Sequence, residues 1–256
     1  MLIRCFSRVR EKHPLVECFA NAVTTNGCAN MLLAAGASPV MADDPVGAIE
    51  FTEKADALSI NIGTFTPTFR DAIRGAQEVA LRRGIPILLD PVGTGCAPSR
   101  DELSHEILKR GVSVVRCNRS EANALLGLKS NTHGVDASAD DAITEKTLDR
   151  AVADVRALAA KYNCVFAVTG AIDLVGGTDS RVAVIRGGHE IMTKVTGSGC
   201  MLSALTAAYG VCGELAYESL KPGEGCGTFA VRLFDAVGNL DVTTLHERLN
   251  YEVRQA

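Results

Sequence analysis

The sequence predicts an α/β fold: a single domain with a central, mostly parallel sheet flanked by helices. The first observation behind this prediction is a set of four short apolar runs, rich in β-branched residues, at 57–63, 85–91, 112–118 and 164–170. Near-continuous apolar runs are typical of strands that are buried on both faces of a parallel sheet. The second observation is helical periodicity between the runs, which is the pattern of strand-helix-strand crossover units.

Two of the intervening segments, 67–83 and 144–162, have clear helical signals. Pro67 stands at a suitable first helical position and Gly84 follows the last one, while Thr144 is a candidate N-cap for the second helix. The expected buried faces consist of Ile73, Ala76, Ala80 and Leu81 in the first helix and of Leu148, Val152, Val155 and Leu158 in the second.

The remaining segments complete the expected organisation of one domain over residues 1–256. Two alternating runs within 181–197 are separated by Gly187, Gly188 and His189, which predicts a hairpin at one edge of the sheet. We expect residues 130–141 to form a surface loop and the chain after the hairpin to be helical to its end.

Composition excludes several classes of protein. The formal net charge of −4, without a block of like charges, does not favour binding to nucleic acid or to an anionic membrane. The first residues contain charges every few positions, so they predict neither a signal peptide nor a membrane span. The nine cysteines have no C-x-x-C pair or zinc-type spacing, which indicates reduced thiols in a cytoplasmic protein.

Residues at the ends of the four predicted strands are candidates for a ligand site, because ligands bind at the carboxyl edge of such sheets. Asp90 is either a metal ligand or a residue that shapes the following loop by an Asx turn. Asn118 and Glu121 have the spacing of a capping box, and Glu121 is also a second candidate carboxylate for a metal. Glu121 can serve as part of the capping box and as a metal carboxylate at the same time.

A glycine-rich turn before a helical segment is the most informative motif. Gly197 and Gly199 flank Ser198, and backbone N–H groups at such a helix start can bind an anion. The segment lacks both the dinucleotide-binding and the P-loop fingerprints. Cys200 stands where the helix dipole can lower the pKa of a thiol, although the residues alone favour the simpler interpretation of a small buried apolar cysteine.

Six motifs together resemble hydroxyethylthiazole kinase, a thiamine-salvage family of the ribokinase-like group. They are GASPVMA at 36–42, NIGT at 61–64, DPVGTG at 90–95, NRSEAN at 118–123, TG at 169–170 and VTGSGC at 195–200. The cysteine that closes the glycine turn is specific, because related kinases usually have aspartate there. The resemblance implies a ribokinase-like fold and transfer of the γ-phosphoryl group of ATP to the primary hydroxyl of 4-methyl-5-(2-hydroxyethyl)thiazole.

The resemblance also assigns roles to residues and implies Mg²⁺ as cofactor and a homotrimer with shared active sites. Cys200 resembles a weak catalytic base beside the reacting alcohol. The other implied roles are substrate contact for Met41 and Gly197, pocket lining between subunits for Asn21 and Gly63, ATP binding for Arg116 and Thr169, and organisation of magnesium for Asp90 and Glu121.

The chain departs from the family pattern at several positions. Glu17 and Ala20 stand where family members usually have His and Thr, and the chain is shorter than the family between Cys200 and Gly223. Two alternatives therefore stay open. One is a hydrolase or amidotransferase with Cys200 as nucleophile, and the other is a nucleotide- or thiazole-binding homologue without catalysis. The candidate bases for the hydrolase are His105, His133, His189 and His246.

Overall fold

The computed structural model describes residues 9–128, 142–179, 181–187, 189–204 and 236–254. Within these ranges the strands are β1 (Leu15–Phe19), β2 (Ser38–Val40), β3 (Ala57–Asn61), β4 (Ile87–Asp90), β5 (Val114–Asn118), β6 (Val165–Thr169), β7 (Asp173–Gly176), β8 (Val182–Ile185) and β9 (Tyr251–Arg254). The helices are α2 (Thr25–Ala35), α3 (Pro45–Thr52), α4 (Pro67–Arg83), α5 (Pro98–Arg110), α6 (Arg119–Leu126), α7 (Leu148–Tyr162), α8 (Ser198–Ala204) and α11 (Val242–Arg248). A 3-10 helix, Glu190–Lys194, precedes α8.

The described strands form one sheet of nine strands in the order β2-β1-β3-β4-β5-β6-β7-β8-β9. The strands from β2 to β6 are parallel to their neighbours, whereas β7, β8 and β9 are antiparallel. The four runs predicted as parallel strands are β3, β4, β5 and β6. The prediction of a mostly parallel α/β sheet is therefore confirmed.

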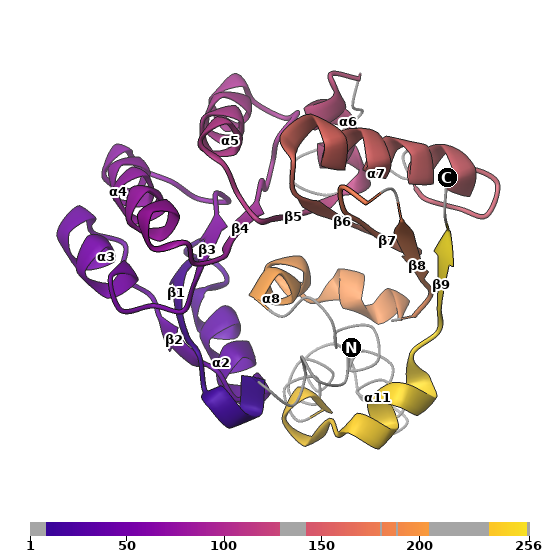
Figure 1. The fold of residues 1–256 in the computed structure, drawn as a ribbon, viewed down its shortest axis with the longest axis horizontal. Coiled ribbons are helices and arrows are strands. Elements are labelled where there is room, and N and C mark those ends of the chain that lie inside the picture. The colour runs from indigo at the N-terminus through magenta and orange to yellow at the C-terminus, as the bar shows by residue number, and fades with distance from the viewer. Residues whose placement is uncertain (1–8, 129–141, 180, 188, 205–235, 255–256) are drawn as a thin grey trace.

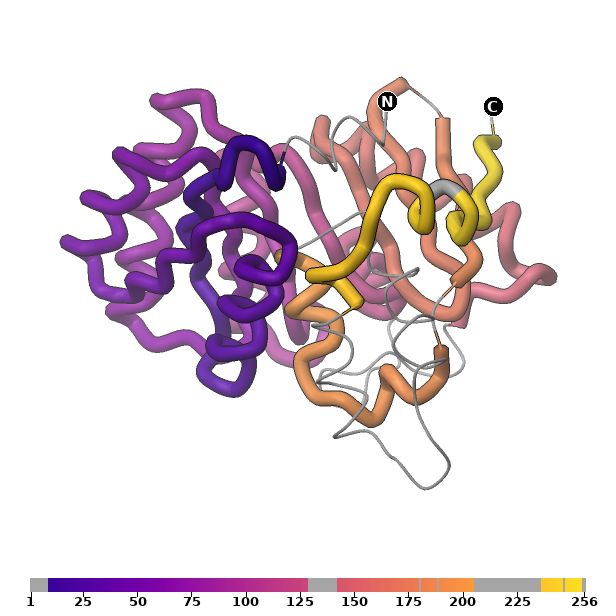
Figure 2. The backbone as a smooth tube through the Cα atoms, turned by 90° about the horizontal axis from the view of Figure 1, so that it is seen from below, coloured from indigo at the N-terminus to yellow at the C-terminus, as the bar shows by residue number. Residues whose placement is uncertain are grey.

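Helices cover both faces of the curved sheet (Figure 1). Helices α3 to α7 lie along the outer side of the curve, and α2, α8 and α11 lie on the inner side. The buried apolar side chains form two clusters that match these layers, an outer core under α3 to α7 and an inner core that includes residues of α2, α8 and α11. Figure 2 shows the same layers from below, with residues 236–254 crossing the inner side.

The predicted helix at 67–83 is confirmed as α4 with the same bounds. The side chain of Thr66 accepts a hydrogen bond from the N–H of Phe69, and Gly84 ends the helix with a left-handed φ of 68°. Leu81 is 45% exposed, so its assignment to the buried face is wrong. It lies one position beyond Ala80, which rotates it about 100° away from the core.

The second predicted helix begins later than expected. Helix α7 starts at Leu148, after Thr147 in the N-cap position, while 145–147 form a turn. Thr144 is therefore not the N-cap, because the chain makes an extra turn before the helix. The four apolar residues of the predicted face are buried as expected.

The predicted hairpin at 181–197 is wrong. Its first half is β8, but β8 pairs with β7 on one side and β9 on the other, and 190–194 form a 3-10 helix instead of a returning strand. The side chain of His189 accepts a hydrogen bond from the N–H of Ile191 and so starts that helix. The expectation of helix up to the C-terminus is also wrong, because β9 follows α11. The loop predicted at 130–141 lies outside the described residues.

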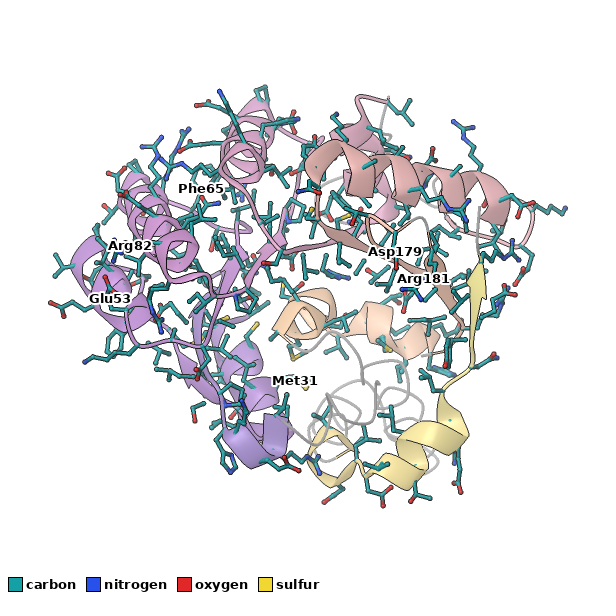
Figure 3. All side chains as sticks on the ribbon, viewed as in Figure 1. Met31, Glu53, Phe65, Arg82, Asp179 and Arg181 are labelled. Carbon is teal, nitrogen blue, oxygen red and sulfur yellow. The ribbon has the colours of Figure 1, made fainter. Side chains whose placement is uncertain are left out.

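The outer helices also contact one another through polar side chains. Arg82 of α4 and Glu53 at the end of α3 point toward one another in Figure 3 and form an ion pair. Both side chains are exposed, so this pair contributes little stability. No helix among the described residues is long and apolar enough to cross a membrane.

Candidate functional site

The carboxyl ends of four neighbouring parallel strands bring polar residues together, as the sequence predicts. Asn61 pairs in register with Asp90 across β3 and β4, and Asn118 pairs with Thr169 across β5 and β6. Most residues of these strands are apolar and face the two cores, and each strand ends in a polar residue at the edge. Helix α8 contacts both β3 and β4, so its residues lie over the same edge.

A chain of hydrogen bonds connects Cys200 of α8 with Asp90. The amide nitrogen of Asn21 donates to the Cys200 Sγ at 3.2 Å and to the Asn61 Oδ1 at 3.2 Å. The Asn61 amide donates in turn to the Asp90 Oδ2 at 2.9 Å, and the Ser203 hydroxyl donates to the same oxygen at 2.6 Å. Asn21, Asn61, Asp90 and Ser203 are all buried. This network fixes the thiol and the carboxylate relative to one another.

Three glycines allow the close approach of backbone to this network. The N–H of Gly63 donates to the Asn61 Oδ1 at 2.8 Å, and a Cβ on Gly63 would lie 2.9 Å from the Asn21 amide nitrogen. Gly197 has a left-handed φ of 78°, and its Cβ would lie 2.3 Å from a Thr24 methyl carbon. A Cβ on Gly199 would lie 2.7 Å from the guanidinium of Arg116. Larger residues at these positions would displace the network.

The environment of Cys200 raises the pKa of its thiol. Burial is the main cause, and the nearby carboxylate of Asp90 adds to it, while the hydrogen bond that Asn21 donates to the Sγ opposes it. The prediction that the helix start lowers this pKa is therefore wrong, because desolvation and a neighbouring negative charge outweigh the helix dipole. The thiol is protonated near neutral pH.

Arg116 and Thr169, the proposed ATP-binding pair, contact each other. The guanidinium of Arg116 donates to the Thr169 hydroxyl at 2.5 Å, and its other terminal nitrogen lies 3.9 Å from the Asp90 carboxylate. The Arg116 side chain is only 12% exposed, between the strand ends and the glycine turn. A fixed positive charge therefore lies at the centre of the site.

The two proposed magnesium carboxylates are both buried. Glu121 and Asn118 form the predicted capping box, and Glu121 also accepts a hydrogen bond from the N–H of Gly93 at 3.0 Å. Burial, followed by the Asp90 charge, raises the pKa of Glu121 to about 7. Burial likewise raises the pKa of Asp90, against the lowering effect of Arg116. The Asp90 Oδ2 accepts hydrogen bonds from the side chains of Asn61 and Ser203 rather than from the backbone of the following loop. The interpretation of Asp90 as an Asx-turn residue is therefore wrong.

A metal fits this pair of carboxylates only in part. The Oδ1 of Asp90 is buried without a hydrogen-bond partner among the described residues, which suits a ligand that brings positive charge. Both oxygens of Glu121 already accept backbone N–H groups, so they can reach an ion most easily through water. No group of three or more potential metal-binding side chains occurs in the described part of the chain.

Met41 lies further from the network than the other predicted residues. It follows β2, is half-buried, and packs against the inner core. That core also contains Met201 of α8, and Cys200 packs against it. The structure therefore places Met41 beside the same core, without a direct bond to Cys200.

Three contributors to the site are not among the predicted residues: Asn61, Thr24 and Ser203. Asn61 ends an apolar run and could have been found by the rule that selected Asp90. Thr24 and Ser203 carry no comparable signal, because their contacts join segments that are far apart in the sequence.

Comparisons with known proteins agree with this geometry. The sequence model of the hydroxyethylthiazole kinase family matches residues 6–221. The chain belongs to this family. Hydroxyethylthiazole kinase from Clostridium acetobutylicum is 37% identical over 98% of this chain and 99% of its own, and the enzyme from Pyrococcus horikoshii is 40% identical over 91% of each.

A solved structure supports the membership in the hydroxyethylthiazole kinase family. The hydroxyethylthiazole kinase of Pyrococcus horikoshii superposes with a TM-score of 0.86 at 35% identity, covering 99% of each chain. Pyridoxal kinase from Staphylococcus aureus in complex with ADP gives a TM-score of 0.53 at 14% identity, covering 94% of this chain and 98% of its own. That likeness concerns the fold alone and confirms the ribokinase-like class.

Proposed function

We propose that this protein transfers the γ-phosphoryl group of ATP to the primary hydroxyl of 4-methyl-5-(2-hydroxyethyl)thiazole. The main support is the network that links Cys200, Asn21, Asn61 and Asp90 in a member of the hydroxyethylthiazole kinase family. Phosphoryl transfer requires mainly positioning and charge neutralisation, and this network provides a rigid acceptor site next to a buried arginine.

In this proposal the roles follow the geometry around Cys200. The alcohol binds beside the Cys200 thiol, with Met41 and Gly197 contacting the thiazole and with Asn21 and Gly63 lining the pocket. Arg116 and Thr169 bind the phosphates of ATP. The thiolate form of Cys200 takes the proton of the alcohol. The raised pKa makes this form a minor fraction near neutral pH, which is tolerable because a loose transition state demands little deprotonation of the alcohol.

Magnesium is part of the proposal. Asp90 would hold the ion through its unpartnered Oδ1, and Glu121 would hold its water shell. When bound, the ion neutralises charge on the phosphates. Among the protein's own groups, the Arg116 guanidinium, 3.9 Å from the Asp90 Oδ2, also supplies positive charge there. We also propose a cytoplasmic location, supported by the lack of disulfides among the six described cysteines.

The cysteine hydrolase alternative is weaker in this geometry. A nucleophilic cysteine needs a lowered pKa or a nearby base, whereas the pKa of Cys200 is raised and its Sγ accepts a hydrogen bond from the amide of Asn21, which is not a base. His105 binds the Asp101 carbonyl within α5, and His189 begins the 3-10 helix. The side chains of His133 and His246 lie outside the described part of the chain.

The test is ADP release from Mg-ATP in a coupled assay with hydroxyethylthiazole and, in parallel, hydroxymethylpyrimidine. We expect magnesium-dependent turnover with the thiazole and much less with the pyrimidine. Equal or faster turnover of the pyrimidine would contradict the proposal. Tight thiazole binding without product would instead support a homologue that binds without catalysis.

A further inference from the structure

Ser203 of α8 is a buried side chain to which the proposed reaction assigns no role. Its hydroxyl donates a hydrogen bond of 2.6 Å to the Asp90 Oδ2. The Gly199 carbonyl, four residues earlier in α8, lies 3.2 Å away and is the usual local acceptor for a serine in a helix. The bond to Asp90 is the shorter of the two and joins residues that are 113 positions apart. The hydroxyl therefore attaches α8 to the end of β4.

The place of Ser203 on α8 puts it on the same side of the helix as the thiol of Cys200. Residues three and four positions apart are neighbours on a helix surface, so Ser203 lies beside both Gly199 and Cys200. Helix α8 lies on the inner side of the sheet and contacts β3 and β4 (Figure 1). Met201 and Leu202 of the same helix belong to the inner core. One side of α8 thus holds Ser203 and Cys200 over the strand ends.

Two separate connections join this side of α8 to Asp90. One is the direct bond from Ser203, and the other runs from Cys200 through Asn21 and Asn61. With the helical turn between Cys200 and Ser203, the two connections form a closed ring. A helix that is attached at one point can pivot about it, whereas two attachments one turn apart also fix its rotation. Ser203 closes the ring.

The same bond orients the Asp90 carboxylate. The Oδ2 accepts hydrogen bonds from Asn61 and Ser203, and the Arg116 guanidinium lies 3.9 Å from it. The Oδ1 has no hydrogen-bond partner among the described residues. Exchange of the two oxygens by rotation would break both bonds to the Oδ2. The bonds therefore keep the Oδ1 available to a group from outside the chain.

We propose that Ser203 is a positioning residue, which closes this ring and so keeps the Cys200 thiol aligned with the Asp90 carboxylate. The inference rests on the proposed function, in which the alcohol binds at Cys200 and the phosphates bind near Asp90 and Arg116. In this role Ser203 acts through Cys200 and Asp90 and not on a substrate. Alignment of reacting groups matters most in the transition state, so loss of the serine hydroxyl should lower kcat rather than raise a KM.

The experiment compares Ser203→Ala and Ser203→Cys with a matched control, Thr52→Val. Thr52 is also a buried helical residue with a hydroxyl hydrogen bond, to the Ala48 carbonyl at 2.7 Å, but it lies on α3 in the outer layer. Circular dichroism and thermal melting establish that each variant folds. Cysteine is a weak donor close to serine in shape, so Ser203→Cys supplies the measurement if Ser203→Ala does not fold. The kcat and both KM values are measured with saturating magnesium.

We expect Ser203→Ala to lower kcat about 10- to 100-fold, the range for a small misplacement of reacting groups, with both KM values within about twofold of the wild type. Ser203→Cys should have an intermediate kcat, and Thr52→Val should keep the wild-type kcat. An unchanged kcat in Ser203→Ala, or an equal fall in Thr52→Val, would overturn the inference.

A double-mutant cycle with Cys200→Ala tests whether the serine acts through the thiol. If Ser203 aligns the thiol, its removal should cost much less kcat when the thiol is already absent, so the two effects are far from additive. A serine that only stabilises the fold, or that holds Asp90 alone, would lower kcat by the same factor in both backgrounds. That result would overturn the inference.

A further measurement does not depend on turnover. The N–H of Met201 donates to the Gly197 carbonyl at 2.8 Å, so its hydrogen exchange reports on the first turn of α8. Exchange at Met201 should be about 3- to 10-fold faster in Ser203→Ala, as for the loss of one hydrogen bond, and unchanged in Thr52→Val. If the wild type fails to phosphorylate the thiazole but this pattern is seen, the proposed function fails and the attachment of α8 by Ser203 stands. If exchange in Ser203→Ala is unchanged, the positioning role fails whatever the activity.

Discussion

The residue that best separates the possible mechanisms is Cys200. Its Sγ accepts a hydrogen bond from Asn21 at 3.2 Å, and its thiol is protonated near neutral pH because burial and Asp90 raise its pKa. A carboxylate in the same place would also accept the Asn21 amide and, unlike the thiol, an aspartate is ordinarily ionised at neutral pH, so it can take the proton of the alcohol. We therefore expect Cys200→Asp to keep or raise kcat in the coupled assay.

The companion variant Cys200→Ala removes the base but keeps the glycine turn and Arg116. Its kcat should fall by at most about 10²- to 10⁴-fold, the usual contribution of a general base. Cys96→Ala, which removes an exposed thiol, serves as a control with unchanged kcat. A folded Cys200→Asp protein that binds ATP but has no kinase activity would contradict the base mechanism and favour a covalent nucleophile.

At the scale of elements, the sequence was sufficient to predict a strand or helix where burial determines its pattern of apolar residues. The runs that became β3 to β6 lie between two helical layers, so both faces had to be apolar and the pattern was unambiguous. Helix α4 could be predicted because Pro67 and Gly84 mark both of its ends. The polar residues at the ends of those strands predicted the location of the site for the same reason.

The wrong predictions concern segments whose structure depends on pairing with distant parts of the chain. Strand β8 pairs with β9, more than sixty residues later, and with β7, which carries only a short alternating pattern. The alternating pattern on both sides of Gly187 predicted that β8 pairs with the segment that follows it. In the structure β8 pairs with β7 and β9 instead. Thr24 and Ser203 were missed as site residues for a similar reason, since their neighbours in space are not their neighbours in sequence.

Helix α6 provides a test that distinguishes a cap from a functional carboxylate. Glu121 accepts hydrogen bonds from the N–H groups of Asn118 and Gly93. Glu121→Gln can keep only one of these bonds, so it should lower stability by about 0.5 to 2 kcal/mol, as for the loss of a cap. We expect kcat to fall strongly as well, because the amide cannot hold magnesium and its water as the carboxylate does.

The control for this prediction is a cap of similar strength elsewhere. The Thr66 side chain accepts the N–H of Phe69 at the start of α4, so Thr66→Ala should lower the thermal midpoint to a similar extent without lowering kcat. A Glu121→Gln enzyme with normal kcat and only a lower melting temperature would show that the residue is a helix cap and nothing more.

At the scale of the whole molecule, an apolar side chain is exposed close to the candidate site. Val23, two residues after Asn21, is 67% exposed. Asn21 and Gly63 lie together beside Cys200 near this surface. An exposed apolar residue beside a candidate site is a suitable contact point between subunits. Val23 fits the expectation of a homotrimer in which the pocket is completed by a neighbouring copy.

We expect sedimentation velocity to show a trimer at assay concentrations, and Val23→Glu to dissociate it and abolish thiazole turnover together. A charge on a surface that becomes buried is costly, because no partner compensates it there. Leu81→Glu on α4 is the matched control: Leu81 is also exposed, at 45%, but it lies on the outer layer away from Cys200, so assembly and activity should both persist. An active monomer, in the wild type or in Val23→Glu, would show that each chain holds a complete site and would remove the shared pocket from the mechanism.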